Sequence, residues 1–590
     1  MYFDRNNLYK FHYKMSIETE CLGLVIHKTR DNLLSQQAHL LVQKHYMRSC
    51  ETSPQQAFAR AAVAFCANDL QLAQRIYDYV STGKCMFSSP ILSNAPFPNE
   101  TPKAFPISCF LAYVPDNLEG LIDHTTEIRW MSVNGGGVGG HWSDVRAISP
   151  DKAPGPIPFL HTIDADMTAY KQGKTRKGSY AAYLNISHPD IIEFINMKIP
   201  TGDSNRKNLN LFNAINITDL FMRAVQRDEQ FDLIDPHDNV CRDTVSARKL
   251  WQLILTTRAR TGGPYLNFID TINRAMPTPM KKAGNKIHGS NLCNEIHLPT
   301  SSKKTAVCCL SSVNLEYYRE WRGDGQLIRD LIRFLDNVLT FFIEHCPPQL
   351  ARAKIGACED RPLGLGVMGE HTLFQKEGIP FESDKACQLD DEIFKFIKQE
   401  AIKESQLLAQ ERGECPVMKG TGMRHSHILA IAPTANSSII LNCSPSIEPW
   451  RGNAFTHRTR IGSHLFKNAM LQRDLAKLQP SQNTDEIWLS IITNKGSVQH
   501  LDIPSELKEI YKTASELDQR NIVKMAANRQ RYLCQGQSIN LFFPFGADVK
   551  YVHETHYKMW EMGGKGLYYY RTESIQSVET ISSTCMSCDG

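Results

Sequence analysis

The sequence predicts an α/β protein in which a mainly helical N-terminal region precedes one large core of alternating strands and helices. The chain has 590 residues, which exceeds the ~250–300 at which a single core usually stops growing, although barrels can be larger. Apolar residues recur at helical spacing near the start of the chain. Over most of the remainder, short apolar runs punctuated by Gly, Pro and Asn alternate with amphipathic helices, a pattern that favours a large α/β core.

Helical periodicity defines the N-terminal region. We expect a second helical run from Gln55 to Val80, after a first helix whose buried face carries Leu34, Ala38, Leu41 and Val42. We take residues 1–16 as an N-terminal extension and residues 17–97 as the helical region.

The core is predicted to span residues 98–575. Its clearest helix runs from Leu327 to Phe342, where the apolar residues form one stripe typical of core packing. Residues 576–590 are polar and rich in Ser and Thr, which predicts a flexible tail. Three apolar runs are strand-like: Ile428–Ala432, Ser538–Phe543 and Leu567–Tyr570.

Composition excludes several classes of function. Hydrophobic residues make up 42% and charged residues 22% of the chain, and the formal net charge is +4, a balance that does not point to nucleic acid. No apolar stretch approaches the ~18 residues that a membrane helix needs, and the first residues lack the apolar centre of a signal peptide. We therefore expect a cytoplasmic protein that binds neither nucleic acid nor a membrane.

The chain contains 17 cysteines. In a reducing compartment these should be buried thiols, metal ligands or redox catalysts rather than structural disulfides. A zinc site usually needs two close pairs of ligands, yet the only C-x-x-C is formed by Cys585 and Cys588, near the end of the sequence. This position favours a mobile redox pair, and we expect no metal in this chain.

The segment 290–296, SNLCNEI, carries an amide, a thiol and a carboxylate at alternating positions. If it is extended, Asn291, Cys293 and Glu295 lie on one side and could meet one substrate. By itself, such a motif is more often a buried cysteine in a strand. The segment, however, resembles the finger-loop motif of ribonucleotide reductase large subunits.

The resemblance extends from about Glu51 to the end of the chain, with the motifs in the same order. PISCF at 106–110 and AVCCLSSVNL at 306–315 resemble the two active-site cysteine segments, and alignment selects Cys109 and Cys308 rather than Cys309. RPLGLGVMG at 361–369 resembles a barrel segment of the family. The fold implied is a ten-stranded α/β barrel of the ribonucleotide reductase and glycyl-radical type, with a central finger loop.

A candidate phosphate site follows an apolar run at 432–438, APTANSS. Free amide donors at a strand-to-helix turn favour anions, although this segment alone is equally consistent with a plain helix cap. The resemblance implies that it holds the phosphates of a ribonucleotide, and that Gln172 and Arg176 face the base. The implied substrate-binding residues are Ser89, Ser108, Pro433, Thr434, Ala435, Asn436 and Ser437.

Three adjacent tyrosines occur in GLYYYR, at 566–571, where packing would be the ordinary interpretation. The resemblance instead implies the radical path of class I enzymes, running from Tyr569 to Tyr568 to Cys293, with Tyr570 structural. The oxidising equivalent would come from a separate small subunit that contains two metal ions, so no cofactor is expected in this chain.

The resemblance also implies a mechanism. A thiyl radical at Cys293 would abstract the 3′ hydrogen of the ribose, Glu295 would act as general base, and Asn291 would hold the sugar hydroxyls. Cys109 and Cys308 would supply two electrons and close into a disulfide. The tail pair would reopen it by thiol exchange, and a thioredoxin or glutaredoxin would recharge the tail.

The sequence departs from the family in two places. It shows no ATP-cone motif near its start, so we expect no switching by dATP through such a domain. The connection at 147–156 is several residues shorter than the usual specificity loop and contains three prolines, which remove amide donors. Asp116 and Arg146 still match effector-contacting positions, but we expect weak effector control, and the homodimer that family members form around this region is put in question.

Rival interpretations remain at this point. The adenosylcobalamin-dependent class shares the barrel and the cysteines but needs no radical subunit, and the tyrosine pair argues against it. A glycyl-radical enzyme is disfavoured because its glycine motif is missing from the C-terminal region. An inactive scaffold homologue should have lost some of the catalytic residues, and none is lost.

Overall fold

The fold is that of a computed structural model, which describes residues 18–149, 153–170, 179–459, 462–478 and 484–572. The expected N-terminal extension and tail, with Cys585 and Cys588, lie outside the described residues. So do Gln172 and Arg176.

The N-terminal region is mainly helical, but it opens with a β-hairpin. Strands β1 (Glu18–Cys21) and β2 (Leu24–His27) pair antiparallel and precede α1 (Gln36–His45), α2 (Pro54–Ala64) and α3 (Leu70–Ser81). The run predicted from Gln55 to Val80 is therefore two helices. A turn with Ala67 and Asn68 at positive φ separates them, and the Asp69 side chain caps α3. Apolar periodicity does not reveal either feature.

A nine-stranded sheet forms the core, in the order β12-β11-β4-β5-β6-β7-β10-β16, with β3 pairing β11 from outside this path. Strands β4, β5, β6, β7 and β10 run parallel to one another. This parallel group pairs antiparallel with β11 at one edge, through β4, and with β16 at the other edge, through β10. The bounds are β3 (Cys85–Phe87), β4 (Cys109–Tyr113), β5 (Gly137–His141), β6 (Ser179–Asn185), β7 (Phe212–Ile217), β10 (Tyr265–Phe268), β11 (Ala306–Asn314), β12 (Leu363–Met368) and β16 (Gly566–Leu567).

Two extended segments continue the sheet beyond β12 and curl it into a barrel. Leu365 bridges Leu429, and Ile431 bridges Gln537, both in parallel. The Tyr568 amide then donates to the Ile539 carbonyl at 2.8 Å, which returns the sheet to β16. These two segments bring the ring to the ten strands that the resemblance implies, although the predicted strand Ile428–Ala432 makes isolated bridges rather than a regular ladder.

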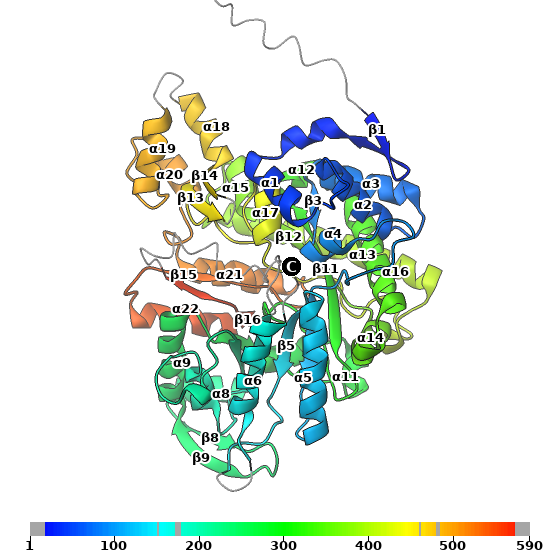
Figure 1. The fold of residues 1–590 in the computed structure, drawn as a ribbon. Helices are drawn as coiled ribbons and strands as arrows, with labels where there is room; N and C mark the ends of the chain where they lie inside the picture. Colours follow the sequence, from blue (N-terminus) through cyan, green and yellow to red (C-terminus); the bar gives the residue numbers. More distant parts are fainter. Residues whose placement is uncertain (1–17, 150–152, 171–178, 460–461, 479–483, 573–590) are drawn as a thin grey trace, which may run out of the picture.

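Helices cover the outside of the barrel (Figure 1). Helix α13 (Gln326–His345) buries the apolar stripe predicted from Leu327 to Phe342, which confirms that prediction. The other long helices are α5 (Leu118–Val133), α6 (Pro156–Ala169), α8 (Asp219–Arg227), α9 (Ala247–Thr261), α14 (Ala351–Asp360), α16 (Asp384–Arg412), α21 (Gln519–Gln530) and α22 (Val549–Glu561).

A satellite unit is inserted between α17 (Ala435–Leu441) and α21 and has its own small hydrophobic core around Trp488. It appears in gold in Figure 1 and comprises β13 (Ala454–Thr459), β14 (Gly462–Lys467), α18 (Ala469–Leu478), α19 (Thr484–Thr493) and α20 (Ser505–Ile510). The remaining elements are β8 (Gln230–Ile234), β9 (Cys241–Ser246), β15 (Leu541–Phe543), β17 (Tyr570–Thr572), α4 (Ser89–Asn94), α7 (Ile191–Asn196), α10 (Ile269–Ala275), α11 (Thr278–Lys282), α12 (Tyr318–Trp321) and α15 (Glu370–Lys376).

The loop between α11 and β11, residues 283–305, carries the Cys293 motif, and its residues 289–300 are all buried. Its Leu292 and Cys293 pack against side chains of β6, β7 and β10. A buried loop must satisfy its own polar groups, which explains the density of hydrogen bonds described below. Within the described ranges, no helix is both long and apolar enough to cross a membrane.

Candidate active site

The Cys293 motif forms a tight turn rather than the extended segment predicted from its alternation. The Asn291 Oδ1 accepts hydrogen bonds from the backbone amides of Glu295, at 3.1 Å, and Ile296, at 3.2 Å. Asn294 has a φ of 64°, in the left-handed region that asparagine tolerates. The extended conformation predicted from the alternation is therefore wrong, because side-chain to backbone hydrogen bonds fold the segment back on itself.

One side of the turn is polar. The Asn291 Nδ2 donates to Glu295 Oε1 at 2.9 Å and to the Cys109 sulfur at 3.3 Å. The Ser538 hydroxyl donates to the other Glu295 oxygen at 3.2 Å and to the Cys293 carbonyl at 2.6 Å. The turn thus brings an amide, a carboxylate and two cysteines together.

Burial sets the proton affinity of Glu295. Its side chain is fully buried, and desolvation raises its pKa to about 7, although hydrogen bonds from Asn291 and Ser538 oppose the rise. A carboxylate with a pKa near neutral pH can both take and return a proton, and this perturbation is typical of catalytic carboxyl groups.

Cys109 and Cys308 are directly opposite each other where β4 pairs antiparallel with β11. Facing residues in such a pair have Cα atoms roughly 4.5–5.5 Å apart, within the range that a disulfide spans. Both are reduced cysteines, and the Gln535 amide lies 3.7 Å from the Cys308 sulfur. Cys309 points the other way, toward the Leu335 carbonyl of α13 at 3.5 Å. The two adjacent cysteines therefore lie on opposite faces of the strand, and Cys308 is the one that faces Cys109.

The other side of the turn is aromatic. The Cys293 thiol is hydrogen-bonded to the Tyr568 hydroxyl, and the rings of Tyr568 and Tyr569 have centroids 4.2 Å apart. Tyr568 is 1% exposed and Tyr569 8% exposed, so only the outer ring has contact with the surface. Tyr570 packs elsewhere, stacked on Phe543 at 4.7 Å.

Two members of this aromatic cluster escaped sequence reasoning. Tyr265, on β10, has its ring centroid 4.6 Å from Tyr568 and 5.1 Å from Tyr569. Arg258, on α9, is fully buried and donates to the Tyr568 carbonyl at 3.1 Å and to the Pro264 carbonyl. Neither lies in a distinctive motif: the pairing of β10 with β16 brings Tyr265 to this cluster, and Arg258 reaches it through the Tyr568 carbonyl.

Five of the candidate phosphate residues, at 433–437, lie at the start of α17, and the other two lie on separate segments. Thr434 precedes that helix, and its hydroxyl accepts from the Ser446 amide at 2.7 Å. Ser89, at the start of α4, lies 2.8 Å from the Tyr46 hydroxyl, and Ser108 contacts the Cys109 sulfur at 3.4 Å. Two further buried hydroxyls nearby in sequence, those of Ser88 and Ser446, have no hydrogen-bond partner, and sequence reasoning did not select them.

The candidate effector residues form an ion pair. Arg146 Nε lies 2.9 Å from Asp116 Oδ2, and His237 Nδ1 contacts the same oxygen at 3.2 Å. The short connection after Arg146 includes a bridge between Ser149 and Ala153. Among the described residues, no group of three or more His, Cys, Asp or Glu is arranged to hold a metal ion.

Comparison with known proteins assigns the family. The family described as ribonucleotide reductase, barrel domain, matches residues 107–421 and 417–570, and the all-alpha domain of the same family matches residues 32–100. Similar curated proteins are named as ribonucleoside-diphosphate reductase large subunits: one from Frog virus 3 is 56% identical and covers 88% of this chain and 93% of its own length. Another, from Invertebrate iridescent virus 3, is 40% identical and covers 96% and 98%.

A solved structure has the same fold. The class Id ribonucleotide reductase alpha subunit of Actinobacillus ureae superimposes with a TM-score of 0.81 at 32% identity, covering 93% of this chain and 98% of that one. The chain belongs to the ribonucleotide reductase large-subunit family, in its class I form.

Proposed function

We propose that this chain reduces ribonucleoside diphosphates to 2′-deoxyribonucleotides with Cys293 as the site of the thiyl radical. One observation carries the proposal: Cys293 lies between a buried phenol, Tyr568, and the buried carboxylate Glu295. The phenol can exchange a hydrogen atom with the thiol, and the carboxylate can accept the 3′-hydroxyl proton while the thiyl radical takes the 3′ hydrogen.

The reducing step would use the pair across β4 and β11. After the 2′-hydroxyl leaves as water, Cys109 and Cys308 give up two electrons and their thiol protons and close into a disulfide. The pair is buried, so its reduction needs a thiol that can reach it. Cys585 and Cys588 are proposed for this exchange, and a thioredoxin or glutaredoxin would recharge them.

The oxidising equivalent is proposed to come from a separate small subunit, which would supply it from a dimetal cofactor. Tyr569 is the outer member of the aromatic pair and Tyr568 the inner one, in van der Waals contact with each other. This order suits transfer inward to Cys293.

The substrate and its setting complete the proposal. The phosphates would bind at the start of α17 with Ser89, and Gln172 and Arg176 would face the base.

Effector control is proposed to be weak, because Arg146 and His237 already contact the Asp116 carboxylate. A cytoplasmic location fits the free thiols among the described cysteines.

A homodimer is proposed through α5. Its outer face exposes Leu118 at 71%, Ile122 at 57%, Trp130 at 42% and Val133 at 44%, an apolar stripe of the kind that marks an interface. Sedimentation of the wild type and of Trp130→Lys tests this: the variant should shift toward monomer.

The decisive experiment combines the purified chain, a candidate small subunit and dithiothreitol with each ribonucleoside diphosphate and triphosphate. We expect deoxynucleotide only with the small subunit present. Turnover by the isolated chain with adenosylcobalamin would contradict the class I assignment, and no product in any combination would contradict the function.

A further inference from the structure

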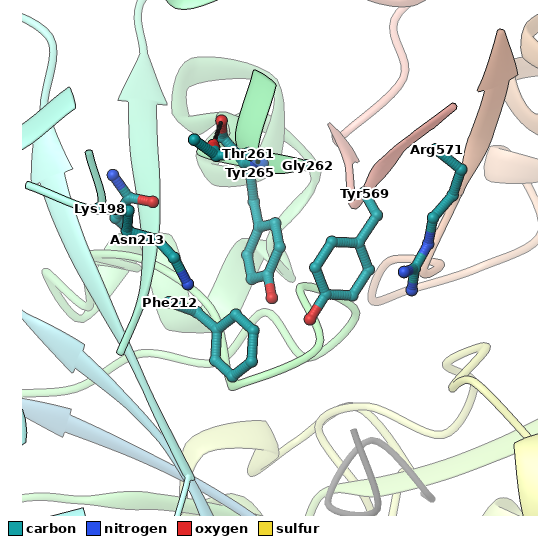
Figure 2. A pocket seen from close by; sticks show the side chains of 9 residues that line it. Lys198, Phe212, Asn213, Thr261, Gly262, Tyr265, Tyr569 and Arg571 are labelled. Atoms are coloured by element: carbon teal, nitrogen blue, oxygen red, sulfur yellow. Dashed lines mark hydrogen bonds between the residues drawn. The ribbon is translucent and has the colours of Figure 1, made fainter. Parts of the chain in front are cut away.

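A cavity of about 170 Å³ opens at the outer end of the tyrosine pair. It is lined by Phe212 and Asn213 of β7, Tyr265 of β10, Tyr569 and Arg571 near the end of the described chain, and Lys198 (Figure 2). We call it the Tyr569 pocket. Its position matters because Tyr569 is the outermost phenol on the way to Cys293.

The floor of the Tyr569 pocket is aromatic. The rings of Phe212 and Tyr265 stack with centroids 6.1 Å apart, and the Tyr569 ring stands edge-on to both, at 6.1 and 5.1 Å. Figure 2 shows the hydroxyl ends of Tyr265 and Tyr569 turned toward each other, with the Phe212 ring beside them. An occupant would therefore rest directly against the Tyr569 phenol.

Two cations border the pocket. The Lys198 Nζ lies 4.6 Å from the Phe212 ring centroid and donates to the Leu211 carbonyl at 2.7 Å. The Arg571 guanidinium lies 4.0 Å from the Tyr569 ring centroid, and its buried Nε has no hydrogen-bond partner. Within the described ranges, neither cation has a carboxylate oxygen within 4.0 Å.

Such an arrangement is costly until an anion fills it. Desolvation lowers the pKa of Lys198 to about 8, although Asp164 opposes the shift. Asp164 forms no ion pair with Lys198 within 4.0 Å, and its carboxylate instead accepts hydrogen bonds from Asn210 and Leu211. Partly buried cations that contact no carboxylate are stabilised by a carboxylate that enters the same pocket.

The size of the pocket limits the occupant. Sites for drug-sized ligands and cofactors occupy roughly 300–1,000 Å³, so a nucleotide does not fit, whereas a single acidic side chain does. The proposed function requires a radical-supplying subunit to approach Tyr569. That requirement selects a side chain of the partner over a free ion.

We propose that the Tyr569 pocket, whose lining includes Lys198 and Arg571, receives one aspartate or glutamate side chain of the radical-supplying small subunit, seated against Tyr569. This inference rests on the proposed function, since it names a contact of the partner that the function needs. Truncating either member of such a partly desolvated charge pair should slow or weaken association.

The test measures the affinity of the small subunit for the full-length chain. Lys198→Met and Arg571→Met keep an unbranched side chain and remove its charge, and each should weaken binding by about tenfold, with a larger loss in the double variant. Lys385→Met, at an exposed position of α16, is the matched control and should bind as the wild type does. Thermal unfolding of each variant shows that the fold is retained.

A second arm identifies the partner group. Each acidic residue of the small subunit is changed to its amide, and one of these variants should couple to Lys198→Met and Arg571→Met in a double-mutant cycle. Acetate, titrated against the isolated chain at constant ionic strength, probes a free carboxylate. Acetate binding without coupling to any partner residue would overturn the proposal in favour of a free ion.

The outcomes separate this inference from the function. A double variant that binds the small subunit as tightly as the wild type, in a system where the wild type turns over, would overturn the pocket assignment alone. Absence of turnover by the wild type would contradict the proposed function, and the pocket assignment with it.

Discussion

The two sides of the Cys293 turn differ in the groups they present. Toward β10 and β16 the neighbours are the rings of Tyr265, Tyr568 and Tyr569. Toward β4 the neighbours are Glu295 and Cys109, both of which accept hydrogen bonds from Asn291, and Cys308 faces Cys109.

The difference teaches how one buried loop can serve two kinds of chemistry. On the aromatic side, closely spaced rings and a protected interior suit the movement of an electron with its proton. On the polar side, a carboxylate whose pKa is raised by burial suits proton transfer to and from a substrate. Cys293 belongs to both sides, so substitutions there should act on both, and substitutions on one side should leave the other intact.

The largest effect is expected for Cys293→Ser, which should abolish turnover because serine cannot provide the thiyl radical. Serine is close to cysteine in volume, so folding and nucleotide binding should change little. Turnover is measured directly, thermal unfolding reports on folding, and equilibrium binding of a nucleoside diphosphate reports on nucleotide binding. A variant that kept about a tenth of the wild-type rate, a barrier change of only ~1.4 kcal/mol, would contradict the assignment.

Tyr568→Phe sharpens the comparison on the aromatic side. Phenylalanine keeps the ring contacts but has no phenolic hydrogen to exchange with Cys293, so turnover with the small subunit should fall to background while nucleotide binding persists. Tyr570→Phe is the matched control, because Tyr570 stacks on Phe543, and it should keep near wild-type turnover. Equal losses in the two variants would show that packing, not radical transfer, explains the effect.

Glu295→Gln tests the polar side. Removing a general base typically costs 10²–10⁴-fold, so kcat should fall by about that factor. The wild-type rate should rise as pH increases through about 7, since the base must be deprotonated and burial raises its pKa to about 7. The variant should lose this limb of the profile, and a profile unchanged by the substitution would assign the base to another residue.

The smallest effect concerns the effector site, away from the turn. Because Arg146 and His237 occupy the Asp116 carboxylate, dTTP, dGTP and ATP should change the reduction rate of any of the four substrates by less than about tenfold, ~1.4 kcal/mol of coupling. Rates measured with and without each nucleotide decide the matter. A larger change would show that the ion pair opens to admit an effector.

Several features could be predicted from the sequence because they depend on local pattern or on the identity of single residues. The apolar stripe of α13 predicted that helix, since periodicity reports which face is buried. The order of cysteine, carboxylate and tyrosine motifs indicated the family, which the comparisons confirm. The selection of Cys308 over Cys309 remains a prediction, and the facing of Cys308 and Cys109 supports it.

Other features were decided by tertiary structure. Alternation predicted an extended Asn291–Glu295 segment, but the Asn291 side chain folds it into a turn that only a barrel interior can enclose. Tyr265 joins Tyr568 and Tyr569 because β10 pairs with β16, and the Tyr569 pocket exists because segments from three parts of the chain meet there. Residue types along the sequence determine which chemistry is available; contacts between residues hundreds of positions apart determine where it is placed, because these depend on how the whole barrel closes.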